Sequence, residues 1–175
     1  MTTKQLILIT EGADMTGKTN ILNELGRRLD LKKFKNIREN NRWWDPEVDF
    51  KYGVEAIVQM SEQLKLSFML DRFHASEYAY SKVYDRLTNE SRIMDVDLRI
   101  SKLNGVIIYC YKTPDKYLAD DGGIIDVNKY DEIKKYYDEF FNKTKCHIIK
   151  LNTNDENLKE QCDFIIKNLK GLKLI

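Results

Sequence analysis

Short runs of apolar, β-branched residues alternate along the chain with longer stretches in which apolar residues recur every three or four positions. The short runs predict strands over residues 6–10, 36–39, 64–70, 106–111 and 147–151. The longer stretches predict helices over residues 17–29, 53–63, 74–87, 95–103, 131–142 and 155–169. Such alternation is typical of a parallel sheet that helices cover on both faces. We therefore expect a three-layer α/β fold with five parallel strands, in a single domain over residues 1–175.

Composition narrows the class of protein. Hydrophobic residues make up 42% of the chain and charged residues 33%, and 29 basic side chains balance 28 acidic ones. This balance argues against a chain-wide electrostatic surface for nucleic acid. No apolar run approaches the ~18 residues of a membrane span, and the N-terminal run is too short for a signal peptide. Cys110, Cys146 and Cys162 have no C-x-x-C spacing and indicate free thiols, so we expect a cytoplasmic protein without a membrane partner.

A glycine-rich segment follows the first predicted strand and opens the first predicted helix. Residues 12–19 read GADMTGKT, the G-x-x-x-x-G-K-T pattern of a phosphate-binding P-loop. The two glycines permit backbone angles that are closed to other residues, and the loop amides and the helix terminus form a nest for phosphate oxygens. Lys18 supplies a charge for the β- and γ-phosphates, and the Thr19 hydroxyl can bind Mg²⁺. The residues expected to bind ATP are Gly12, Ala13, Asp14, Met15, Thr16, Gly17, Lys18, Thr19 and Asn20.

Charged residues at the ends of the other predicted strands are the next candidates, because ligands of parallel sheets bind beyond the carboxyl ends of the strands. Asp71 could hold Mg²⁺ directly or through water, and Arg72 could pair with a phosphate through its planar fork. Arg38 could bind a phosphate of the acceptor, and Glu39 could act as a general base or position Mg²⁺. The alternative for each pair is an exposed charge of little energetic value.

Aromatic residues lie close to these charges. Arg42, Trp43 and Trp44 follow in a polar loop, where adjacent tryptophans suggest a wall on which a base stacks. Filling of the core is at least as common a use of tryptophan. Phe73 and Tyr78 have the same two interpretations.

The segment E-G-x-D-x-x-G-K-T at residues 11–19 resembles the P-loop of thymidylate kinases and their deoxynucleoside kinase relatives. The run DRFHAS at residues 71–76, with Ala79 and Tyr80 beyond it, is similar to the D-R-Y-x-x-S-x-x-A-Y segment of that family, and residues 38–39 resemble its R-E pair. The likeness covers nearly the whole chain, although only the P-loop and the Asp-Arg segment are specific. It implies a P-loop kinase fold, ATP with Mg²⁺, and a short mobile lid over approximately residues 112–127.

The same resemblance implies roles for individual residues. Asp14 would touch the sugar hydroxyl of the acceptor, Asp71 would lie near the metal with Thr19, and catalysis would consist of positioning and charge stabilisation. The catalytic set is Lys18, Arg72, Asp14 and Glu39. The acceptor-binding set is Asp14, Arg38, Arg42, Trp43, Arg72 and Phe73. The chain departs from the family pattern at Met15, where an arginine is usual, at Phe73, which replaces a tyrosine, and in having no arginine after Arg99.

Three functions follow from these residues. The leading hypothesis is a kinase that transfers the γ-phosphate of ATP to a (deoxy)nucleoside monophosphate of thymidylate type. The second is a kinase that acts on a hydroxyl of a nucleoside, or of a hydroxymethylated pyrimidine in DNA, because a carboxylate could then serve as base. The third is a nucleotide-binding regulatory module with slow hydrolysis, which the missing arginine suggests. A homodimer is compatible with each.

Overall fold

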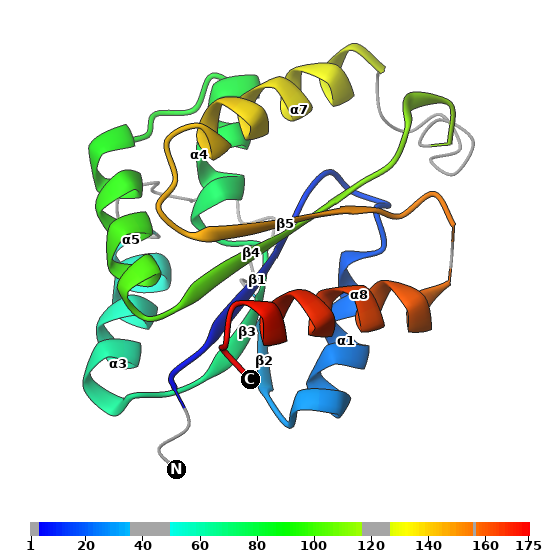
Figure 1. The fold of residues 1–175 in the computed structure, drawn as a ribbon. Coiled ribbons are helices and arrows are strands. Elements are labelled where there is room, and N and C mark those ends of the chain that lie inside the picture. Colours follow the sequence, from blue (N-terminus) through cyan, green and yellow to red (C-terminus); the bar gives the residue numbers. More distant parts are fainter. Residues whose placement is uncertain (1–3, 36–49, 117–126, 156) are drawn as a thin grey trace.

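Five parallel strands form a sheet at the centre of the computed structural model, which describes residues 4–35, 50–116, 127–155 and 157–175 (Figure 1). The strands are β1 (Ile7–Glu11), β2 (Lys32–Lys35), β3 (Phe68–Asp71), β4 (Gly105–Tyr111) and β5 (His147–Asn152). Their order across the sheet is β2-β3-β1-β4-β5. Central β1 pairs with β3 through Ile7 and Phe68, and with β4 through Ile7 and Gly105. The carboxyl ends of β1 and β3 therefore meet at one edge.

Helices cover both faces of this sheet. The described helical segments are α1 (Lys18–Leu29), the π-helical turn η1 (Phe50–Glu55), α3 (Ala56–Leu64), α4 (His74–Val83), α5 (Glu90–Lys102), α7 (Val127–Phe141) and α8 (Leu158–Gly171). Figure 1 shows α1 and α8 on one face and α3, α4, α5 and α7 on the other. Strand β1 serves both cores because its side chains alternate: Ile7 and Ile9 join the α4–α7 side, and Leu8 joins the α1–α8 side. The expected three-layer α/β fold is confirmed.

The second strand lies earlier in the chain than the apolar pattern predicts. We expected residues 36–39, but β2 covers Lys32–Lys35 and residues 36–49 lie outside the described part. An edge strand has one strand neighbour and a partly exposed face, so it does not need a continuous apolar run. Phe34 illustrates this: its ring meets Phe68 edge-on at 5.5 Å between centroids, and the residue is still 44% exposed.

The bounds of other elements differ from the prediction for local reasons. The third strand begins at Phe68 rather than at residue 64, because α3 continues to Leu64 and ends at Lys65, which has a left-handed φ of 53°. Helix α5 begins at Glu90, earlier than expected, because the Asn89 side chain caps it by accepting from the Arg92 amide at 3.2 Å. No helix in the described part combines the length and the apolar character that a bilayer span requires.

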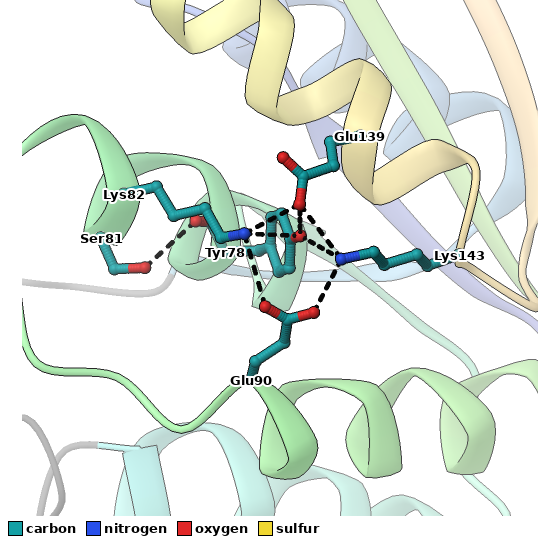
Figure 2. Close-up of polar contacts among 6 residues, drawn as sticks. All are labelled: Tyr78, Ser81, Lys82, Glu90, Glu139 and Lys143. Carbon is teal, nitrogen blue, oxygen red and sulfur yellow. Dashed lines mark hydrogen bonds and ion pairs between the residues drawn. The ribbon is translucent and has the colours of Figure 1, made fainter.

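A cluster of polar side chains joins α4, α5 and α7 (Figure 2). The Tyr78 hydroxyl donates to Glu139 and accepts from Lys82 at 2.9 Å and from Lys143 at 2.7 Å. Glu90 pairs with Lys143 at 2.7 Å and with Lys82 at 3.4 Å. Hydrogen bonds from Lys82 and Tyr78 lower the pKa of Glu139 to about 2. Two ammonium groups and two carboxylates thus balance around one phenol, and they hold the three helices together.

A second polar cluster, centred on the fully buried His74 and Asp97, lies between α4, α5 and the turn before β5. The Asp97 carboxylate contacts His74 Nε2 at 3.0 Å and accepts from the Thr144 hydroxyl and from the Lys145 amide at 2.6 Å. Burial alone would raise the pKa of Asp97, but these hydrogen bonds outweigh it and lower the pKa. Because its oxygens are already engaged, Asp97 acts as a structural brace and not as a ready metal ligand.

Candidate active site

The glycine loop between β1 and α1 is shaped by two positions that only glycine fits well. Gly12 has a φ of 132°, and a Cβ added there would lie 2.1 Å from the carbonyl oxygen of Cys110 on β4. Gly17 has a φ of 76° and precedes α1 without a side-chain cap, so the first helical amides face outward from the helix end. Met15 also has a positive φ, 60°, and is 55% exposed. The largest side chain between the two glycines, that of Met15, is therefore directed to solvent.

Lys18 lies at the centre of the loop and is only 7% exposed. Its ammonium group donates to the carbonyl oxygen of Ala13, and at 3.3 Å to the hydroxyl of Thr16, which itself donates to Ala13 at 2.8 Å. Burial, followed by the charge of Arg72, lowers the pKa of Lys18 to about 8. Within the described residues, the hydrogen-bond partners of this buried cation are neutral oxygens, so it is suited to an anionic ligand.

Asp71 and Thr19 meet beside the loop. The Thr19 hydroxyl donates to Asp71 Oδ2 at 2.9 Å, although the two residues come from α1 and β3. They meet because β3 pairs with β1 in a register that places Asp71 beside Thr10, one position before the end of β1. Thr19 is exposed on the first turn of α1, as is Asn20, whereas Asp71 is buried. A hydroxyl and a carboxylate are the hard oxygen donors that Mg²⁺ accepts.

Arg72 follows directly and is held in an unusual conformation. Its φ is 62°, in the left-handed region that arginine rarely adopts, and its amide donates to Thr10 O at 2.9 Å. The guanidinium contacts the Asp14 carboxylate and lies 4.9 Å from the centroid of the Tyr80 ring. Burial opposes its charge, but Tyr137, Tyr80 and Asp14 outweigh burial and raise the Arg72 pKa. The arginine is therefore a permanent cation beside the P-loop.

The remaining predicted residues divide into two groups. The ring of Phe73 is buried in the core, 5.4 Å from the His74 ring centroid, so only its backbone amide faces the loop. Arg38, Glu39, Arg42 and Trp43 lie outside the described residues, as does the greater part of the expected lid, residues 117–126. The structure thus brings together Asp14, Lys18, Thr19, Asp71 and Arg72.

One polar network at this place was not predicted from the sequence. Glu11 is completely buried at the end of β1 and is hydrogen-bonded to Ser76 on α4 and to Tyr137 on α7. The available signal was the position of Glu11, a carboxylate directly after a run of apolar residues in a central strand. Its partners lie 65 and 126 positions away, which no local pattern could reveal.

Comparison with known proteins places this geometry in a structural class. No protein-family model and no curated protein matches the sequence. Among solved structures, the YorR protein from Bacillus subtilis, in complex with phosphorylated GDP, is 20% identical with a TM-score of 0.69, over 94% of this chain and 95% of that one. Deoxyadenosine kinase from M. mycoides with bound dCTP is 19% identical, with a TM-score of 0.61, over 94% and 99% of the two chains. Thymidylate kinase from Candida albicans is 14% identical, with a TM-score of 0.63, over 98% and 93%. The chain therefore has a nucleotide kinase-like P-loop fold.

Proposed function

We propose that this protein is a kinase that transfers the γ-phosphate of ATP to a nucleotide-like acceptor, with a nucleoside monophosphate of thymidylate type as the leading choice. The observation that carries the proposal is the turn over residues 71–73. It contacts the loop through the Asp71 carboxylate on Thr19 and through the Arg72 guanidinium on Asp14. A short turn thus joins the carboxylate that we assign to Mg²⁺ to a fixed cation. Similar folds in a deoxyadenosine kinase and a thymidylate kinase support the same class of reaction.

The donor side of the proposed site is the glycine loop. The amides that follow Gly12, over residues 13–20, and the positive end of α1 bind the phosphate oxygens of ATP. Lys18 leaves the carbonyl of Ala13 for the β- and γ-phosphates, which compensate its charge better than a neutral oxygen does. Burial of this lysine strengthens its attraction for an anion, because little water screens it.

Magnesium fits the oxygen pair of Thr19 and Asp71. We infer that the hydroxyl and the carboxylate hold the ion directly or through water, since Mg²⁺ keeps part of its water shell in such sites. When bound, the ion neutralises charge on the phosphates of the donor. The two residues are positioned for this by β1–β3 pairing and need no rearrangement to meet.

The acceptor side rests on Arg72 and Asp14. A phosphate of the acceptor would take the place of the Asp14 carboxylate on the planar fork of Arg72, and Asp14 would then be free to bind a sugar hydroxyl. The Asp14 side chain is 61% exposed, so this exchange needs no opening of the core. On the family resemblance, the proposal also assigns Arg38, Arg42 and Trp43 to the acceptor and a catalytic role to Glu39. The ring of Phe73, which was expected to bind the acceptor, is buried in the core instead.

The decisive experiment incubates the protein with ATP, Mg²⁺ and one acceptor at a time: each nucleoside monophosphate, each free nucleoside, and hydroxymethylated DNA. We expect ADP and a nucleoside diphosphate in equal amounts with a thymidylate-type monophosphate. A phosphorylated nucleoside or DNA would select a hydroxyl acceptor instead, and slow release of ADP with every acceptor would select a regulatory module. Lys18→Ala should abolish transfer, and Lys159→Ala, on an exposed position of α8, is the matched control. Transfer by Lys18→Ala at the wild-type rate would refute the donor site.

A further inference from the structure

The buried carboxylate of Glu11 lies between the P-loop and the arginine turn. Its Oε1 accepts from the backbone amides of Phe73 at 2.8 Å and Ser76 at 3.3 Å. Its Oε2 accepts from the Ser76 hydroxyl and from the Tyr137 hydroxyl at 3.1 Å. A fully buried carboxylate is tolerated only when donors surround it, and here four donors do so, from Phe73 before α4, from α4 and from α7. The residue before Gly12 is thereby tied to two helices.

Tyr137 extends this network to the loop itself. Its hydroxyl oxygen accepts from the Gly12 amide at 3.3 Å, while its proton serves Glu11 Oε2 or the Ser76 hydroxyl oxygen, which lies 2.8 Å away. The side chain is completely buried on α7. Burial, and then the charge of Glu11, raise the pKa of Tyr137 well above its usual value, so the phenol keeps its proton. One hydroxyl therefore contacts the first glycine of the loop and the carboxylate that precedes it.

The same network fixes the arginine turn. Two consecutive amides of the turn bind the last residues of β1: the Arg72 amide donates to Thr10 O and the Phe73 amide donates to Glu11. Between these bonds Arg72 has its left-handed φ of 62°. Such a conformation persists only where the surrounding bonds impose it. Glu11 is one of those bonds, and its second oxygen depends on Tyr137 and Ser76.

We propose that Tyr137 is a positioning residue, which holds the Gly12 end of the P-loop through its hydroxyl oxygen and the Arg72 turn through Glu11. It touches neither nucleotide and acts only through these residues. The inference rests on the proposed function, because its readout is the affinity of the loop for ATP. It also gives Ser76 a narrower role: Ser76 supports Glu11 but has no bond to the loop amide.

The test measures the Kd for ATP·Mg²⁺ without acceptor, and then kcat and KM with the best acceptor. Tyr137→Phe keeps the ring but removes the hydroxyl that accepts from Gly12 and donates toward Glu11. The Kd should therefore rise about tenfold, the equivalent of one charge-assisted hydrogen bond. Ser76→Ala keeps the bond from Gly12 to Tyr137, so its Kd should stay within about twofold of wild type while kcat falls. Tyr109→Phe is the matched control: its ring lies 5.1 Å from the Tyr137 ring, and its hydroxyl has no hydrogen bond to residues 11–19.

If these variants acted only through lost packing, Tyr137→Phe and Tyr109→Phe should change the Kd for ATP equally. A raised Kd in Tyr137→Phe alone therefore identifies a positioning role. A wild-type Kd in Tyr137→Phe, or an equal loss in Tyr109→Phe, would overturn the inference. If Tyr137→Phe does not fold, exchange of the Gly12 amide in the wild-type protein decides: protection supports the bond to Tyr137, and rapid exchange overturns it. Binding of ATP without any transfer would refute the proposed kinase, and the Kd comparison would still decide the role of Tyr137.

Discussion

Lys18 is a cation in a place that water barely reaches, and this makes the stability of the nucleotide-free protein depend on pH. The pKa falls from its ordinary value of 10.5 to about 8, chiefly because burial removes the ammonium from water. Below pH 8 the folded state bears the full cost of the buried charge. Between these two pKa values the unfolded chain keeps the proton and the folded chain releases it, so stability rises with pH. The difference between the two pKa values corresponds to about 3 kcal/mol in the free energy of unfolding.

The measurement compares urea unfolding of the wild-type protein with that of Lys18→Met from pH 7 to pH 10. Methionine fills a similar volume without a charge, so the difference between the two free energies of unfolding isolates Lys18 from every other titrating group. We expect the wild-type protein to gain about 2 to 3 kcal/mol relative to the variant over this range. Equal urea dependences for the two proteins would confirm that both unfold from comparable states.

Lys159→Met, on an exposed position of α8, is the control, because that side chain stays in water in both states. The difference in free energy of unfolding between Lys159→Met and the wild-type protein should stay constant from pH 7 to pH 10. A difference between wild type and Lys18→Met that is equally independent of pH would refute the account of Lys18 as a desolvated cation.

Binding of ATP should take up about half a proton at pH 8 and none near pH 6, because phosphate restores the charge of Lys18; calorimetry in buffers of different ionisation enthalpy measures this, and equal heats in all buffers at pH 8 would contradict it. Gly12→Ala should abolish ATP binding, since its Cβ would meet the Cys110 carbonyl at 2.1 Å; normal affinity by fluorescence titration would show that the loop yields. Asp97→Asn should cost about 2 kcal/mol of stability in urea unfolding, because the new amide NH₂ would face the Thr144 hydroxyl or the Lys145 amide in place of an accepting oxygen; a cost below about 0.5 kcal/mol would contradict the brace.

Much of this molecule could be predicted from local pattern. The P-loop, the parallel sheet and the place of Asp71 at a strand end all follow from apolar periodicity and from where Gly12, Lys18 and Asp71 fall relative to it. The second strand escaped the prediction because the edge segment Lys32–Lys35 has a single strand neighbour and carries three lysines. Hydrophobic pattern predicts strands that are buried on both faces, and it is a weak signal for strands at the rim of a sheet.

The polar network around Glu11 was not predicted from the sequence for a different reason. Its bonds depend on how α4 and α7 pack, and such packing is decided by shape across distant parts of the chain. Phe73 is the converse case: an aromatic residue next to a functional arginine suggests ligand contact, but its ring fills the core and its amide supports the turn. The sequence predicts where the turn lies along the chain. Only the fold shows whether the side chain or the backbone of each residue takes part in the site.

The position of β1 in the middle of the sheet also governs when the protein can assemble during translation. Its first partner begins at Phe68 and its second at Gly105, so β1 has no strand neighbour until Phe68–Asp71 has been synthesised and is paired on both sides only after Gly105–Tyr111 has followed. Until then the run Ile7–Ile9 is an exposed apolar segment of high β-propensity, the kind that recruits chaperones or aggregates. Slowing translation before β4 is complete should therefore lower the yield of native protein more than slowing it afterwards.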